Sequence, residues 1–310
     1  MSNEKINGED FQKNIQNESK CERLPVIIVG FAIVSILLSF ILIYLVDLRN
    51  IFGLRDYLFS LDDSYFFYDY RPLLFQNWYR NGGIAELMQW SLLAASAFVS
   101  IFIAGKLHKS RTNAYKFWRI MGIGFLLLLI EDAGDPRHTI RSFVQAIFRE
   151  SIQGPMGSLS ELIYFGILAF IIIFAVVKYR NVIKESSRCT RYFIIAFVSY
   201  ALATSLSFFG TATGIDLYGF LGENMFNWML ALGDEGLAHS WEMINLSEGW
   251  NYIGFFLMDS MLEEAIELIG AASFLAGSIS YFLFLSNKNS QEDINIIIPE
   301  LVQIDDENID

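Results

Sequence analysis

Residues 25–46 read PVIIVGFAIVSILLSFILIYLV, an apolar run of 22 residues that contains no charged side chain. A helix needs about 20 consecutive apolar residues to cross the hydrocarbon core of a bilayer. The run is too long for the hydrophobic part of a signal peptide, and no small-residue cleavage site follows it. It therefore predicts an uncleaved transmembrane helix.

Five further apolar runs of similar length follow. The chain of 310 residues is 54% hydrophobic and contains 28 Phe, more apolar surface than a soluble domain of this length needs. We expect the other spans over residues 84–104, 114–133, 161–177 and 192–209, and within residues 253–285. About 20 residues counted back from Leu285 reach Ile266, so we expect the residues before Ile266 to be interfacial or a separate turn. The predicted fold class is all-α: a polytopic integral membrane protein with six transmembrane helices, plus interfacial amphipathic helices on the extracytoplasmic side.

Lysine and arginine gather in the two short connections, between spans two and three and between spans four and five. Cytoplasmic loops carry an excess of these residues, so we assign both connections and both termini to the cytoplasm. The longer connections, residues 47–83, 134–160 and 210–260, then lie outside. We expect the lipid bilayer as a partner and no nucleic acid. The basic residues are Lys106, Lys109, Arg111, Lys116, Arg119, Lys178, Arg180, Lys184, Arg188 and Arg191.

Composition divides the chain into three parts. We predict a disordered cytoplasmic tail over residues 1–24, a six-span membrane domain over residues 25–286 and an acidic cytoplasmic tail over residues 287–310. The last tail has seven acids and one Lys, so it carries −6 of the net charge of −12. It is a candidate docking segment for a cytoplasmic partner. Cys21 and Cys189 both fall in cytoplasmic segments and should stay reduced thiols.

Two outer segments have the pattern of amphipathic helices. Asp135-Pro136 is typical of a helix start, with Asp135 as the N-cap and Pro136 at the first helical position. Apolar residues then repeat at spacings of three and four, which predicts helices that lie at the outer membrane interface. The first stripe is Ile140, Phe143, Val144, Ile147 and Phe148, and the second is Leu217, Leu221, Met225, Trp228 and Leu232.

Three carboxylates are the main candidates for a functional site. Glu131 and Asp132 directly follow the apolar run at residues 122–130, and Glu267 lies in the sixth span. At 1.5 Å per residue, Glu131 lies about 21 Å and Glu267 about 27 Å from the inner membrane boundary, in a hydrocarbon core of about 30 Å. Acids at this depth are costly and usually functional. We therefore predict a carboxylate-lined cavity in the outer half, between spans three and six.

Three neighbouring acids are further candidates for binding a ligand or a proton, although each has a structural explanation. Asp135 fits an N-cap, Glu263 completes a capping box with Ser260, and Glu264 is a first-turn acid favoured by the helix dipole. Glu161 likewise completes a capping box with Ser158.

A structural alternative also applies to Glu131, Asp132 and Glu267. These acids could pair with Arg137 or Arg141 and only fix the helix bundle, because structural ion pairs also perturb buried acids.

The histidines suggest a metal hypothesis. His138 and His239 both fall in outer segments, and together with one or two of Glu131, Asp132, Asp135 or Glu267 they could hold a divalent metal such as zinc. No H-E-x-x-H, Gly-x-Ser-x-Gly, P-loop or dinucleotide-binding motif supports a particular enzyme.

Three functions follow from these residues. The leading hypothesis is binding or transport of a cation, or of a proton-coupled small solute, at Glu131, Asp132 and Glu267. The first alternative is a metal-dependent hydrolase or transferase that acts on lipid or peptide at the outer leaflet. The second is a structural or assembly subunit of a membrane complex, whose acids serve only stability.

Overall fold

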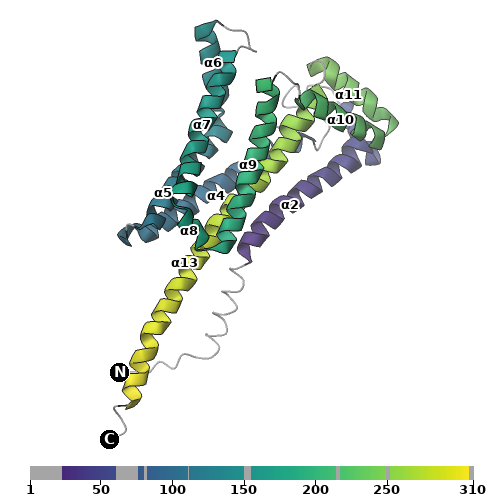
Figure 1. The fold of residues 1–310 in the computed structure, drawn as a ribbon. Coiled ribbons are helices and arrows are strands. Elements are labelled where there is room, and N and C mark those ends of the chain that lie inside the picture. Colours follow the sequence, from purple (N-terminus) through teal and green to yellow (C-terminus); the bar gives the residue numbers. More distant parts are fainter. Residues whose placement is uncertain are drawn as a thin grey trace.

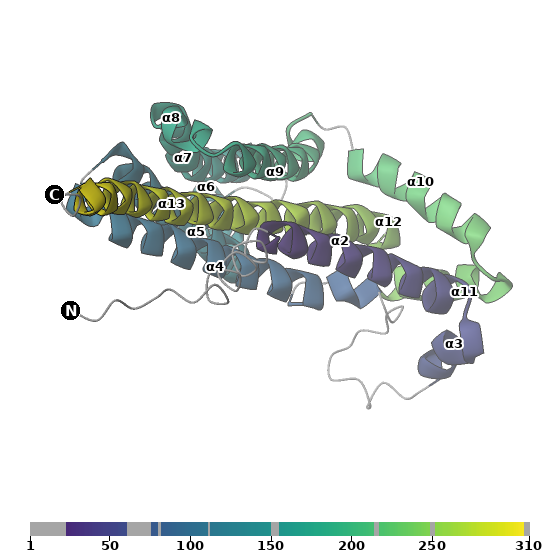
Figure 2. The ribbon, with the colours of Figure 1, turned by 90° about the horizontal axis from the view of Figure 1, so that it is seen from below.

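The computed structural model describes residues 23–60, 76–79, 82–110, 112–149, 155–213, 217–248 and 252–306. All regular elements within these ranges are helices. The long helices form an elongated bundle, and the C-terminal helix extends well beyond its neighbours (Figures 1 and 2). The all-α prediction is therefore confirmed for the part of the chain that is described.

The helices follow the chain in a simple order. Two of the short elements, η1 and η6, are π-helices, and η2, η4 and η5 are 3-10 turns. The elements are α2 (Leu24–Leu42), η1 (Ile43–Leu48), η2 (Ile51–Gly53), α3 (Leu54–Phe59), η4 (Gln76–Tyr79), α4 (Ile84–Leu107), η5 (His108–Ser110), α5 (Asn113–Gly134), α6 (Pro136–Phe148), α7 (Pro155–Lys178), α8 (Arg180–Lys184), α9 (Ser187–Thr213), α10 (Leu217–Leu232), α11 (Glu235–Glu248), α12 (Tyr252–Phe256), η6 (Leu257–Glu263) and α13 (Glu264–Asp306).

Four stretches of helix are long and apolar enough to cross a membrane: Leu24–Leu48, Ile84–Ser110, Leu159–Lys178 and Ile253–Lys288. They coincide with four of the six predicted spans. The other two predicted spans are the helices α5 and α9, which are long but more polar. For example, α5 includes Lys116 and Arg119 near its start and Glu131 and Asp132 near its end.

The helix α13 is central to the bundle, where it packs against α9, α4 and α2 (Figure 2). Small residues on α13 allow α9 to approach closely. A Cβ atom at Gly270 would lie 2.8 Å from the ring of Tyr200, and one at Gly277 would lie 2.6 Å from the ring of Phe193. These two glycines therefore let the aromatic rings of α9 pack directly against the backbone of α13.

Aromatic side chains fill the core between α5, α9 and α13. Trp118 and Phe125 of α5 are fully buried, as are Phe274 and Tyr281 of α13. The ring centroids are 4.9 Å apart for Trp118 and Tyr281 and 4.8 Å apart for Phe125 and Phe274. This packing holds α5 and α13 side by side along the part of each helix that precedes or follows the candidate acids.

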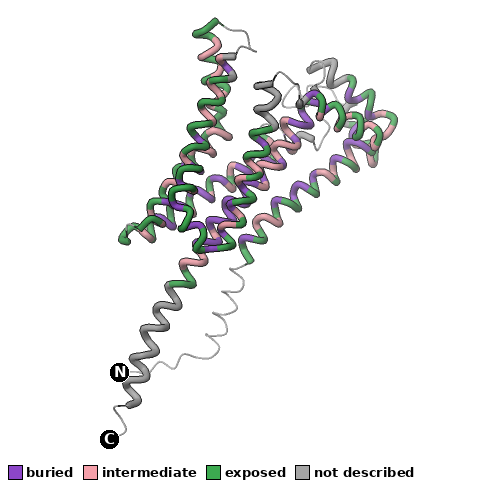
Figure 3. Tube along the Cα trace, in the orientation of Figure 1, coloured by how far each residue is buried: buried purple, intermediate pink, exposed green. Residues whose placement is uncertain are grey.

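Much of α2 and α7 is exposed, as Figure 3 shows, and many of the exposed side chains of these two helices are large and apolar. In the most apolar stretch of Leu159–Lys178, 17% of the residues are buried within the protein. The corresponding share in Ile253–Lys288 is 67%. Such surfaces are stable next to lipid and costly next to water. The exposed side chains of α7 include Leu162, Ile163, Ile167, Phe170, Ile173 and Val177.

The sixth span differs from its prediction at its beginning. We expected a separate or interfacial segment before residue 266, but α12, η6 and α13 follow one another without a break. Because the chain is already helical at Ser260, the capping box predicted for Ser260 and Glu263 is wrong. The helix instead widens into a π-helix over Leu257–Glu263, a feature often found at functional sites.

The cap predicted at Ser158 and Glu161 is also wrong, and the cap predicted at Asp135 is confirmed in position only. α7 begins at Pro155, so Glu161 lies inside the helix and does not complete a capping box at its start. Asp135 does precede α6, and Pro136 does occupy its first turn, but the Asp135 side chain makes no capping hydrogen bond. Its backbone is left-handed, with φ of 46°, which directs the chain sharply from α5 into α6.

The predicted tails fall mostly at the limits of the described structure. Residues 1–22 and 307–310 lie outside the described residues. The predicted division at residue 287 is not a break in the backbone, because α13 continues as one helix to Asp306.

Candidate functional site

Carboxylates from three helices meet where α4 and α13 begin and α5 ends. Asp132 of α5 interacts electrostatically with Glu267 of α13 and with Glu86 of α4. Glu264 of α13 interacts with the same three side chains. We call Glu86, Asp132, Glu264 and Glu267 the acidic cluster. The structure thus brings together three of the six acids that the sequence suggested, and it adds Glu86.

The helix α13 contributes two acids from its first turn. Glu264 and Glu267 are three residues apart, so their side chains lie on the same face of the helix. Their position in the first turn also places negative charge near the positive end of the helix dipole. The Glu267 carboxylate accepts a hydrogen bond of 2.8 Å from Nε2 of Gln89.

The helix α4 contributes an acid and an amide that the sequence analysis missed. Glu86 and Gln89 are buried, with exposed fractions of 8% and 0%. The Glu86 carboxylate accepts a hydrogen bond from the backbone N–H of Gly82, just before the helix. An acid in a first turn has an ordinary explanation in the helix dipole. The three-residue spacing from Glu86 to Gln89 was the available signal that both side chains share one face.

Glu131 precedes Asp132 on α5 but has its own partners. Arg137 of α6 lies 3.7 Å from Glu131, measured from Nε to Oε1. The hydroxyl of Tyr164 donates a hydrogen bond to the same carboxylate. The Arg137 guanidinium also lies over the ring of Phe165, 4.9 Å from its centroid. Glu131 therefore has the ion pair that the structural alternative expected.

A second polar network joins α6 to α7. Nδ1 of His138 lies 2.6 Å from Oδ1 of Asp135, and Arg141 donates to both Glu161 oxygens at 3.2 Å. Asp135 and Glu161 thus find partners here, which explains their presence without the caps predicted for them. Arg141 pairs with Glu161 and not with the three acids suggested by the structural alternative.

The acidic cluster contains more negative than positive charge. Arg137 acts on Asp132 and on Glu267, but it is shared with Glu131. Asp259, on the preceding π-helix, adds a further negative charge that acts on Glu267. Several carboxylates therefore face one shared guanidinium.

Some acceptors of the cluster also lack donors. Asp132 Oδ2, Glu264 Oε2 and Gln89 Oε1 are buried and have no hydrogen-bond partner among the described residues. A buried polar atom without a partner costs about 1–3 kcal/mol, and more when it is charged. Two donors beside the cluster, Arg137 Nε and the Tyr200 hydroxyl, also have no hydrogen-bond partner among these residues, so the donors that are present do not reach these acceptors. The site is therefore short of positive charge and has acceptors that the described residues leave unsatisfied.

The metal hypothesis finds no support in the described residues. Within them, no three His, Cys, Asp or Glu side chains are arranged so that they could hold a metal ion. His138 lies on α6 and His239 on α11, and these helices are far apart in both ribbon views (Figures 1 and 2). The structure thus does not bring together the two histidines that the hypothesis required.

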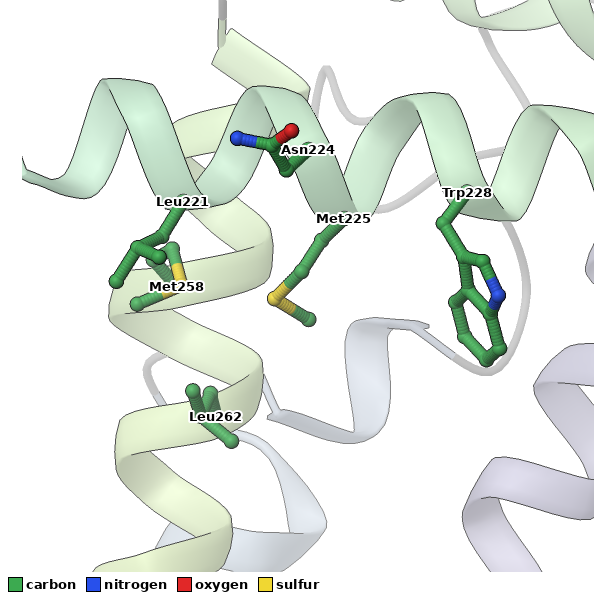
Figure 4. A pocket seen from close by; sticks show the side chains of 6 residues that line it. All are labelled: Leu221, Asn224, Met225, Trp228, Met258 and Leu262. Carbon is green, nitrogen blue, oxygen red and sulfur yellow. The ribbon is translucent and has the colours of Figure 1, made fainter.

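A hollow of about 340 Å³ lies between α10 and η6 (Figure 4). Three residues of the second predicted amphipathic stripe, Leu221, Met225 and Trp228, line it together with Asn224. Met258 and Leu262 of η6 form its other side. The lining is almost wholly apolar, so the hollow is chemically distinct from the acidic cluster.

Comparisons of this chain with protein-family models, with curated proteins and with solved structures find no match. The four apolar helices indicate a membrane protein. A more specific function must be argued from the side chains of the site.

Proposed function

We propose that the chain is a six-span membrane protein that binds or transports a cation, or a proton together with a small solute, at the acidic cluster. The observation that carries this proposal is the excess of carboxylates between α4, α5 and α13. Glu86, Asp132, Glu264 and Glu267 act on one another, while the guanidinium that reaches them is shared with Glu131.

The charge excess matters because of where the cluster lies. Glu86 belongs to the apolar helix Ile84–Ser110, and Glu264 and Glu267 belong to Ile253–Lys288. An acid costs about 2.5–3.5 kcal/mol at the centre of a membrane helix on insertion scales. The cost is smaller near the outer boundary, where these acids lie, but neighbouring carboxylates also repel one another. Binding of a proton or a cation would remove most of both costs. Reversible binding of positive charge is therefore the simplest function for this site.

We assign different roles to Glu131 and Asp135. Glu131 is held by Arg137 and Tyr164, and Asp135 is held by His138. Both would position the end of α5 and the start of α6 around the cluster. Glu131 and Asp135 thus have the structural role that the alternative gave to buried acids, whereas Asp132, Glu264 and Glu267 would bind the ligand.

We propose that α5 and α9 are the two additional spans. They contain 22 and 27 residues and are about 33 and 40 Å long, enough for a core of about 30 Å. Both termini would then be cytoplasmic, and the cluster would lie in the outer half of the membrane.

Contacts between connections support this topology. Two segments assigned to the outside meet where the backbone N–H of Asp234 donates to the carbonyl of Leu48, at 2.9 Å. On the side assigned to the cytoplasm, the Lys106 ammonium lies 4.7 Å from the ring centroid of Phe282, near the inner end of the sixth span. Tyr281 also donates a hydrogen bond of 3.4 Å to Glu185 in the connection between spans four and five.

The experiment that tests this function is charge movement in proteoliposomes that contain the purified full-length protein. Currents would be recorded after steps in proton, sodium, potassium or calcium concentration. We expect a wild-type current that is lost in Asp132→Asn and in Glu267→Gln. Glu161→Gln is the matched control, because Glu161 pairs with Arg141 outside the cluster. A wild-type current that persists unchanged in both cluster variants would contradict the proposal.

A further inference from the structure

The partnerless atoms of the cluster specify what a ligand must provide. Asp132 Oδ2, Glu264 Oε2 and Gln89 Oε1 are all hydrogen-bond acceptors without a partner in the described part of the chain. Gln89 has an exposed fraction of 0%, and its amide nitrogen already donates to Glu267 within the cluster. Its carbonyl oxygen, on the same amide group, is therefore also held at the cluster. A complementary ligand would supply N–H or O–H donors and positive charge.

A bare metal ion fits these acceptors poorly. Calcium and magnesium require several oxygen atoms to converge on one point, at about 2.0–2.6 Å from the ion. No three acidic, His or Cys side chains of the described ranges have such an arrangement. The acceptors instead come from three helices, α4, α5 and α13, so an ion with directional donors suits them better.

An aromatic side chain also borders the cluster. Tyr200 of α9 interacts electrostatically with Glu267, Asp132 and Glu264. Its ring packs directly on α13, beside Gly270, one turn after Glu267. The ring is stacked on Phe274, with the centroids 5.5 Å apart, so its contribution to a ligand is its hydroxyl, which has no hydrogen-bond partner among the described residues. A phenolic hydroxyl can donate or accept a hydrogen bond and can therefore assist the carboxylates in holding an ammonium group.

We propose that the acidic cluster binds an organic ammonium ligand, a primary amine or diamine. Its N–H groups donate to Gln89 Oε1, Asp132 Oδ2 and Glu264 Oε2. An ammonium group has three donors and no acceptor, which matches a site that has acceptors to satisfy. This inference rests on the proposed function, because it names the class of cation that the same site takes.

The test is binding of putrescine to the full-length protein in lipid nanodiscs, measured by calorimetry. We expect saturable binding that weakens about 10-fold or more in Asp132→Asn and in Glu264→Gln. A hydrogen bond to a charged group contributes about 1.5–3 kcal/mol, and 1.4 kcal/mol corresponds to a factor of ten. Glu161→Gln should bind like the wild type. Tetramethylammonium, which has the charge but no N–H donor, should bind much more weakly than putrescine.

The outcomes separate this inference from the proposed function. Equal binding of putrescine and tetramethylammonium, or binding that both cluster variants leave unchanged, would overturn the inference. If putrescine does not bind, but the proteoliposomes carry a proton or metal-ion current that the cluster variants abolish, the inference fails and the proposed function stands. The absence of both signals would contradict both.

Discussion

Gln89 and Glu267 form the one hydrogen bond of the described structure that links α4 to the acids of α13, and its removal tests how far the cluster depends on it. Gln89→Leu would leave a buried carboxylate oxygen without its donor. We expect the free energy of unfolding to fall by about 1–3 kcal/mol, measured as a lower melting temperature in detergent. Ser91→Ala on the same helix is the control, because Ser91 is exposed and bonds only to its own helix. Equal melting temperatures for Gln89→Leu and Ser91→Ala would show that the contact contributes nothing.

The second prediction at this scale concerns Cys189, which is fully buried in the aromatic core. A thiol without access to solvent is protected from reagents, and only the thiolate reacts. In a Cys21→Ser variant, Cys189 is the remaining cysteine of the sequence. We expect no maleimide labelling of this variant in the folded state and complete labelling after unfolding, followed by mass spectrometry. Rapid labelling of the folded protein would mean that the core around Cys189 is open.

The residues of the site could be predicted only in part. The depth of a side chain in the membrane follows from its position along one helix, whereas its contacts depend on how the helices pack together. Counting residues along a helix gave the depth of Glu131 and Glu267. Glu267 belongs to the cluster, and so does Asp132, the neighbour of Glu131. Glu264 was named too, with the dipole as its explanation. Glu86 and Gln89 were missed because their importance comes from the face of α4 that meets α13. Which faces meet is decided by packing, and a single sequence does not contain that information directly.

At the scale of elements, the side chain of Arg55 on α3 joins two segments that are distant in sequence. It is fully buried, donates to the backbone carbonyl of Asp47 at 2.9 Å, and lies 2.7 Å from Oδ1 of Asp234, next to α11. Removal of one partner from a buried ion pair costs about 3–5 kcal/mol, and Asp234 is partly exposed. We therefore expect Arg55→Met to lower the free energy of unfolding by about 3 kcal/mol, measured by thermal melting.

Arg49 offers a matched control for this prediction. It lies nearby but makes only exposed contacts, of 3.4 and 3.5 Å, with the carbonyls of Leu232 and Gly233. Arg49→Met should change stability by less than about 0.5 kcal/mol. The account of α3 fails if the two substitutions have the same effect.

The helices themselves were predictable, whereas the starts of α7 and α13 were not. Long apolar runs and the Asp135-Pro136 pair correctly indicated α2, α4, α7 and α6. The capping boxes at Ser158 and Ser260 did not start helices, because α7 begins earlier and because η6 continues α12 into α13. A capping motif indicates that a helix can begin at a given residue. Whether the chain is already helical before that residue depends on how the preceding segment packs.

At the scale of the whole molecule, the proposed topology predicts which side of the membrane each connection faces. A reporter fused after Asn50 should read as extracytoplasmic, and one fused after Lys109 should read as cytoplasmic. Asn50 lies just after the first span, and Lys109 lies at the end of the second span, so the two positions face opposite sides of the membrane in this topology. Alkaline phosphatase and green fluorescent protein fusions would give complementary readings. A cytoplasmic reading after Asn50 would contradict the six-span arrangement.

The most direct test of the central claim, exchangeable positive charge at the acidic cluster, is carbodiimide labelling of the membrane-embedded protein. Dicyclohexylcarbodiimide is apolar and reacts with protonated carboxyl groups, and peptide mass spectrometry locates the adducts. We predict adducts at Asp132, Glu264 or Glu267 that decrease when the binding cation is added, and none at Glu161, which is paired with Arg141. The absence of adducts at all three cluster acids, or labelling that no cation reduces, would contradict the account.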